Sequence, residues 1–134
     1  MLDLKNIILT EEDEDWVSYQ LNTDLPLFGA VALEENATLS ISRSVDLKDC
    51  LHKVSEFINS LGGFRETLED FYSDTYDIDT DGWYDSLEVY GASFIVLSDK
   101  SIVAGFSATD GVNPEETLEI EIHDNKIISM EYVE

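Results

Sequence analysis

Basic residues are scarce in this chain. Seven lysines and arginines stand against thirty aspartates and glutamates, which gives a formal net charge of −23 over 134 residues. Such a field repels nucleic acid and anionic membranes, and it attracts basic proteins and cations and accelerates their encounter. We therefore expect neither a nucleic-acid nor a membrane partner. The same charge also fits two simpler interpretations, which are solubility and life in high salt.

Long apolar runs, cysteine pairs and a secretion signal are lacking as well. The longest apolar runs, such as residues 7–9 and 94–97, are far too short to cross a bilayer. The first residues show no basic region followed by a long apolar stretch. Cys50 is the only cysteine, so the chain has no internal disulfide. Together these features predict a cytoplasmic protein.

Prolines and linker-like segments are also few. The chain has two prolines, no internal repeat and no low-complexity stretch, while 43% of its residues are hydrophobic. A chain of this length buries roughly two thirds of its unfolded surface. We predict a single domain covering residues 1–134.

The clearest element is a helix over about residues 46–61. Ser44 or Asp46 can cap its first N–H groups, and we expect Gly62 and Gly63 to end it in the left-handed conformation. Its apolar residues recur at three- and four-residue spacing and share one face. They are Leu47, Cys50, Leu51, Val54, Phe57, Ile58 and Leu61.

The rest of the chain is rich in strand patterns. A short second helix, with Phe64, Leu68 and Phe71 inward, follows the first one. Alternation predicts strands over residues 16–22, 27–33, 37–42, 84–90, 93–97, 101–108, 117–123 and 126–133. The last two form a hairpin, and a three-residue loop, 124–126, would pair Ile122 with Ile128 and Glu119 with Glu131. We predict an α+β fold: a mainly antiparallel sheet with the central helix packed on one face.

The sharpest local motif spans residues 77–88, DIDTDGWYDSLE. Acidic residues at alternate positions, a glycine at the sixth and a glutamate at the twelfth resemble the EF-hand calcium loop. Calcium binds six to eight oxygen ligands, which such a loop supplies. The resemblance implies Asp77, Asp79, Asp81 and Glu88 as side-chain ligands. It covers these twelve residues only, a strand is expected after them, and an acidic turn ending at Gly82 is the simpler alternative.

Signatures of catalysis are missing. The chain has no nucleophile elbow, zinc-protease motif, P-loop or dinucleotide glycine pattern. Cys50 shares the apolar helix face with leucine and valine, which predicts a buried thiol. His52 and His123 are isolated and predicted to face solvent. We expect a protein that is not an enzyme and holds no cofactor, calcium being the one alternative.

Aromatic residues and carboxylates alternate around residues 70–90. Tryptophan and tyrosine supply the anchors common at interfaces, and carboxylates meet arginine and lysine. Alternatively, the aromatics fix this segment to the core. Trp83 would serve as an anchor if exposed, and a cationic partner would relieve the repulsion between Glu119 and Glu131. The predicted partner surface comprises Asp74, Asp77, Asp79, Asp81, Trp83, Tyr84, Glu119 and Glu131.

In size, charge and architecture the chain resembles the acidic immunity proteins of bacterial toxin systems, including contact-dependent growth inhibition. Those small cytoplasmic proteins block a toxin domain, often a nuclease, by covering its basic cleft. The resemblance is one of overall character, so no functional residue is carried over. It implies a basic protein partner, a toxin domain. A calcium-binding module and a DNA-mimicking inhibitor of another basic protein are the alternatives.

Overall fold

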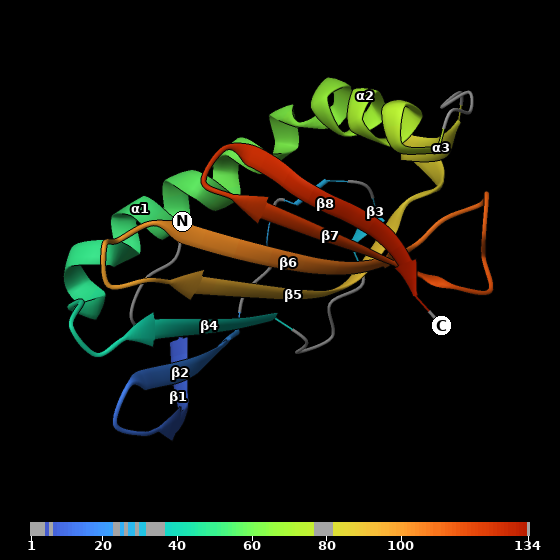
Figure 1. Ribbon diagram of the computed structural model, residues 1–134. Helices are drawn as coiled ribbons and strands as arrows, with labels where there is room; N and C mark the ends of the chain where they lie inside the picture. The colour runs from blue at the N-terminus through green and yellow to red at the C-terminus, as the bar shows by residue number, and fades with distance from the viewer. Residues whose placement is uncertain are drawn as a thin grey trace.

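One mixed sheet organises the chain. The structure is a computed structural model that describes residues 5, 7–22, 25, 27–28, 30–31, 37–76 and 82–133. Within these residues eight strands form the sheet, in the order β1-β2-β4-β5-β6-β7-β8 with β3 beside β5 (Figure 1). The elements are β1 Ile7–Glu12, β2 Trp16–Leu21, β3 Ala30–Val31, β4 Ala37–Ser42, α1 Leu47–Ser60, the 3-10 turn η2 Leu61–Gly63, α2 Arg65–Tyr76, α3 Trp83–Ser86, β5 Glu88–Val96, β6 Ile102–Thr109, β7 Thr117–His123 and β8 Lys126–Val133.

The pairing confirms the α+β class and the mainly antiparallel sheet. Only the β3–β5 and β4–β5 pairs are parallel, while the other five pairs are antiparallel. None of the helices in the described part of the chain is long and apolar enough to cross a membrane.

The parallel β4–β5 pair explains why the helices lie between these two strands in the sequence. Two parallel neighbours need a crossover connection, and residues 43–87 make it with α1, α2 and α3. Asp46 begins α1, because its Oδ1 accepts the Lys48 N–H at 3.0 Å. Ser44, the alternative cap, instead shares a hydroxyl hydrogen bond with Ser42 at 3.0 Å.

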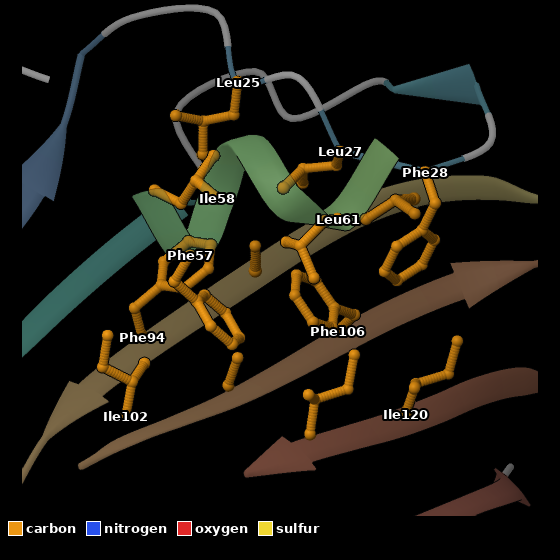
Figure 2. Close-up of a cluster of buried hydrophobic side chains, with 14 of the residues drawn as sticks. Leu25, Leu27, Phe28, Phe57, Ile58, Leu61, Phe94, Ile102, Phe106 and Ile120 are labelled. Carbon is orange, nitrogen blue, oxygen red and sulfur yellow. The ribbon is translucent and has the colours of Figure 1, made fainter. Parts of the chain in front are cut away.

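Aromatic rings join α1 to the sheet. Phe57 of α1 lies edge-on to Phe94 of β5, with ring centroids 6.2 Å apart. Phe94 contacts Phe106 of β6 at 5.8 Å, and Phe106 contacts Phe28 at 4.9 Å (Figure 2). The predicted burial of Phe57 is confirmed, whereas Leu51, also expected to be buried, is only partly so. Along β6, alternate residues are fully buried and those between them only partly, so the sheet's two faces differ.

Two predicted backbone features are wrong. Gly62 and Gly63 do not take the left-handed conformation, because Gly82, with φ 77°, is the only glycine of the described residues that has positive φ; they continue α1 as the turn η2. Residues 83–86, placed mostly in a strand by the alternation, form the short helix α3. The strands expected at 84–90 and 93–97 are one continuous strand, β5.

The last hairpin keeps its predicted strands but not its predicted turn. Asp124, with φ 52°, and Asn125 form a two-residue turn, and Lys126 already pairs with His123. Ile122 therefore pairs with Ile127 and not with Ile128, which is the extra residue of a bulge between the Ile122–Ile127 and Glu121–Ser129 pairs. This bulge restores the predicted pairing beyond it. Ile127 is buried and Ile128 is 46% exposed. The Glu119–Glu131 pair is confirmed.

Within the strand expected at 27–33, residues Ala30–Val31 form β3, which pairs with β5. Residues 32–36, which would connect this strand to the one at 37–42, lie outside the described residues.

Phe57→Ala and Leu51→Ala test this helix face. We expect Phe57→Ala to lower the free energy of unfolding by about 3–5 kcal/mol, because it opens a cavity against Phe94. Leu51→Ala removes a partly exposed side chain and should cost about 1 kcal/mol. Denaturant unfolding measures both values, and equal losses would contradict the assignment of the helix face.

Candidate functional site

Trp83 is an internal anchor. Its indole is 1% exposed and stacks on the Tyr72 ring with centroids 4.2 Å apart. Its Nε1–H donates to Oδ2 of Asp110 at 2.9 Å. A buried indole with a satisfied N–H is a stable arrangement. Trp83 was predicted to anchor a partner only if its side chain is exposed, and it is buried. For this residue, the alternative that the aromatics fix the segment to the core is correct.

Asp110 receives four hydrogen bonds. Besides the Trp83 indole, Oδ2 accepts the Tyr132 hydroxyl at 2.5 Å. Oδ1 accepts the backbone N–H groups of Val112 at 3.0 Å and Asn113 at 2.9 Å. Asp110 is 4% exposed and is the only buried acidic side chain among the described residues. Four donors replace the water that a buried carboxylate loses, which makes its burial tolerable.

Tyrosines extend this cluster toward α2. The Tyr72 and Tyr132 hydroxyls lie 2.7 Å apart, and the Tyr76 hydroxyl donates to the Met130 carbonyl at 3.2 Å. Burial, followed by the hydrogen bonds with Asp110 and Tyr72, raises the pKa of Tyr132 far above its usual value near 10. Burial likewise raises the pKa of Tyr72 and of Tyr76. These phenols therefore stay protonated at neutral pH, which keeps their O–H donors in place.

Tyr84 is half-buried and already has a cationic neighbour. The Arg65 guanidinium lies over its ring, 4.9 Å from the centroid, and pairs with Asp85 at 3.3 Å. A partner arginine would therefore compete with this internal one for the same ring face.

The predicted acidic surface does not form one face. Asp74 is exposed on α2, which packs against β8 through the Tyr72–Tyr132 and Tyr76–Met130 contacts. Glu131 points to the opposite side of β8, because side chains alternate along a strand and both Met130 and Tyr132 face the helix. Asp77, Asp79 and Asp81 lie outside the described residues.

Glu119 has internal support that the sequence does not indicate. The Ser107 hydroxyl, on the neighbouring strand β6, lies 3.0 Å from Oε1 and 3.1 Å from Oε2. A hydroxyl donor inside the protein therefore already stabilises the Glu119 carboxylate opposite Glu131. The remaining negative charge still faces solvent, because Glu131 is exposed.

Of the four predicted calcium ligands, Glu88 alone lies within the described residues. Glu88 is exposed and is the first residue of β5, and α3 before it has four residues. An EF-hand needs a second helix after its loop, and a strand stands there instead. Outside the undescribed segments, no three His, Cys, Asp or Glu side chains gather as a metal site would require. Calcium binding by residues 77–88 stays a prediction.

The cysteine and both histidines lie where the sequence places them. Cys50 is buried, and burial raises the pKa of its thiol, so little thiolate forms. His52 and His123 are exposed, and their Nε2 atoms lie 2.8 Å from Glu56 and 3.1 Å from Glu121, respectively.

The face of the sheet that points away from α1, which we call the open face, was not predicted from the sequence. Small and hydroxylated side chains form its middle, and carboxylates occupy both ends. Its residues include Glu11, Trp16, Ser18, Ser40, Glu88, Ser93, Gly105, Ser107, Glu119, Glu121 and Glu131. The strands as described contain only two basic residues, His123 and Lys126, which lie together at the last turn.

Trp16 is the tryptophan that the open face presents. It is half-buried at the start of β2 and lines a hollow of about 290 Å³ with Glu11, Asp13, Ser18, Ser40 and Ile95. The alternation Trp16, Ser18, Gln20 against Val17, Tyr19, Leu21 already places Trp16 on the more polar side of this strand. That pattern is the signal that could have found it.

Asp110→Asn tests the buried carboxylate. Either orientation of the new amide places an NH₂ donor against donors, so the free energy of unfolding should fall by about 3 kcal/mol. Asp74→Asn removes the same charge from an exposed helix position and should change it by less than about 0.5 kcal/mol. Denaturant unfolding of both variants decides. Similar values for the two would show that Asp110 is not essential to the core.

The tyrosine cluster predicts an alkaline transition. Tyr72, Tyr76 and Tyr132 have raised pKa values in the folded state. Their contribution to stability is therefore complete below about pH 10, the unfolded pKa, and is lost as the pH rises above it. Phenolate absorbance and circular dichroism followed together should show these tyrosines ionising as the protein unfolds. Ionisation of all six tyrosines near pH 10 with the fold intact would contradict the cluster.

Comparison with protein-family models, curated protein sequences and solved structures finds no match to this chain. A function for this chain therefore rests on its own charges, burial and contacts.

Proposed function

We propose that this protein binds a basic protein partner through the open face of its sheet. In its specific form, the proposal is an immunity protein that occupies the basic cleft of a bacterial toxin domain, such as a nuclease, in the cytoplasm. It includes no catalytic role. The distribution of charge over the strands carries the proposal.

The open face carries carboxylates with few internal cations. Glu119 and Glu131 are directly opposite each other, and Glu121 on the same side of β7 has His123 as its neighbour. Elsewhere the arginines are engaged: Arg43 pairs with Glu12, and Arg65 pairs with Asp85. Repulsion among the remaining acids destabilises the folded state. A basic partner converts that repulsion into attraction, which is strongest where the contact excludes water.

The composition of this face suits a protein more than a small molecule. Its middle combines serines and glycines, such as Ser93, Gly105 and Ser107, with the half-buried Tyr90, Ile95 and Val103, so polar and apolar groups lie side by side. Small-molecule sites are usually concave and mostly apolar, whereas protein interfaces are flatter and have polar rims. A DNA-mimicking inhibitor would use the same charges. Whether the partner is a toxin domain or another basic protein distinguishes the immunity protein from the DNA mimic.

A second acidic surface provides the rival docking site. Glu66, Asp70 and Asp74 are all exposed and lie four residues apart on α2, so they share one side of that helix. This stripe contains Asp74, which the sequence also predicted to lie on the partner surface. It lies on the helical side of β8. The open face and the α2 stripe can therefore be tested separately.

Matched triple variants decide between the two surfaces. Glu119→Gln/Glu121→Gln/Glu131→Gln and Glu66→Gln/Asp70→Asn/Asp74→Asn each remove three negative charges. The partner is captured on the immobilised chain, purified, and measured by surface plasmon resonance at about 0.05 M and about 0.5 M NaCl. We expect the wild-type association rate to fall at least about 10-fold at the higher salt. The open-face triple should weaken that salt dependence more than the α2 triple.

Three outcomes would contradict the proposal. A salt-independent association rate would mean that the acidic charge does not steer the partner. A larger effect of the α2 triple would transfer the interface to the helical side. Failure to block the activity of the captured protein would remove the toxin-neutralising form.

A further inference from the structure

The tip of the β1–β2 hairpin is built around a fixed carboxylate. Oδ1 of Asp13 accepts the backbone N–H groups of Asp15 and Trp16, each at 2.8 Å. These hydrogen bonds lower the pKa of Asp13, so its side chain is ionised at neutral pH. The Asp13 N–H donates to the Trp16 carbonyl at 2.9 Å, which closes the turn. The position of Trp16 relative to this carboxylate is therefore set by the backbone.

The hollow beside this turn combines an indole with carboxylates and hydroxyls. Trp16 and Glu11 line it from the two strands of the hairpin, and Asp13 lines it from the turn. The Ser18 and Ser40 hydroxyls, 3.1 Å apart, join β2 to β4 in its lining. It opens on the same face of the sheet as Glu119 and Glu131.

We propose that this hollow receives one arginine side chain of the basic partner, so that Trp16 has the anchoring role that sequence analysis gave to Trp83. The inference rests on the proposed function and adds the residue type that the partner inserts. A guanidinium stacks on an indole face and donates in its own plane to carboxylates and hydroxyls. The lining of the hollow contains such acceptors, in Glu11, Asp13 and the two serines, together with the Trp16 indole.

The opposite side of the same hairpin already holds a guanidinium. Arg43 donates to the Glu12 carboxylate and to the Asp13 carbonyl oxygen. Glu11 and Glu12 are neighbours in β1, and their side chains point to opposite faces of the sheet. The internal arginine therefore occupies Glu12 and leaves Glu11 on the open face, where the hollow lies.

This position also sets a distance on the partner. The hollow lies at β1 and β2, and Glu119 and Glu121 lie on β7, four strand spacings from β2 in the sheet. At about 4.8 Å per spacing, the two acidic ends are separated by about 19 Å across the strands. Because they are also offset along the strands, a complementary partner presents its anchoring arginine at least that far from a second basic group.

The pocket can be tested without the partner, because the chain has two tryptophans and only one of them lines the hollow. The two indole N–H signals are followed by NMR during titration with N-acetylarginine amide at constant ionic strength. We expect the Trp16 signal to shift and saturate with a dissociation constant of about 1–10 mM, the scale of a single small contact. N-acetyllysine amide should bind at least about 3-fold more weakly, because an ammonium cannot stack. The Trp83 signal should not shift.

Variants complete the test. Glu11→Gln should weaken arginine amide binding at least about 3-fold, and Glu66→Gln, the matched charge removal on α2, should leave it unchanged. Trp16→Leu should abolish it, as followed through the backbone amide signals of Asp15 and Ser18 because the Trp16 indole is then absent, and circular dichroism confirms the fold. A non-saturating shift, equal shifts at both tryptophans, equal binding of the lysine amide, or equal effects of Glu11→Gln and Glu66→Gln would each overturn the pocket.

The two proposals fail in different ways. If Trp16→Leu leaves the release rate of the partner unchanged while association stays salt-dependent, the pocket is wrong and the open face stands. If arginine amide binds as expected but association of the captured partner is salt-independent, the pocket stands and the basic-partner proposal is wrong. We expect Trp16→Leu to speed release at least about 10-fold, as for a buried anchor.

Discussion

A single buried carboxylate connects the helical layer to the sheet. Asp110 accepts from Trp83 of α3, from Tyr132 of β8 and from two backbone N–H groups after β6. Burying that charge is costly unless every acceptor position is used, so the surrounding groups have little freedom to move. Tyr76 and Trp83, which flank the acidic residues 77–81 in the sequence, are both fixed to this end of the core.

The second constraint is the charge of −23. In the described chain both arginines pair with carboxylates away from the open face, Arg43 with Glu12 and Arg65 with Glu69 and Asp85. On the open face, the Glu121 carboxylate lies 3.1 Å from Nε2 of His123. Asp110 itself shows how the fold stabilises a carboxylate without a cation, by supplying donors. On the open face, the Ser107 hydroxyl supplies one such donor to the Glu119 carboxylate. A partner's basic groups would meet charges that the interior does not neutralise.

Much of the fold follows from local sequence patterns. The spacing of apolar residues identifies α1, and alternation identifies β7 and β8 with the Glu119–Glu131 register. Other features depend on partners far away in the sequence. Trp83 is buried because Asp110, 27 residues later, accepts its indole N–H. Ile122 pairs with Ile127 and not with Ile128, because the hairpin has a two-residue turn and a bulge that alternation alone does not reveal. The candidate pocket was missed for a similar reason, because Trp16 and Ile95 meet only across three strands.

The most direct measurement is carboxylate footprinting of the protein free and in complex with its captured partner, read by mass spectrometry. Glu11, Glu119 and Glu131 on the open face should become protected from carbodiimide labelling when the partner binds. Glu66, Asp70 and Asp74 on α2 should react equally in both states. Protection of the α2 residues with the open face still reactive would contradict the assignment of the open face as the binding surface.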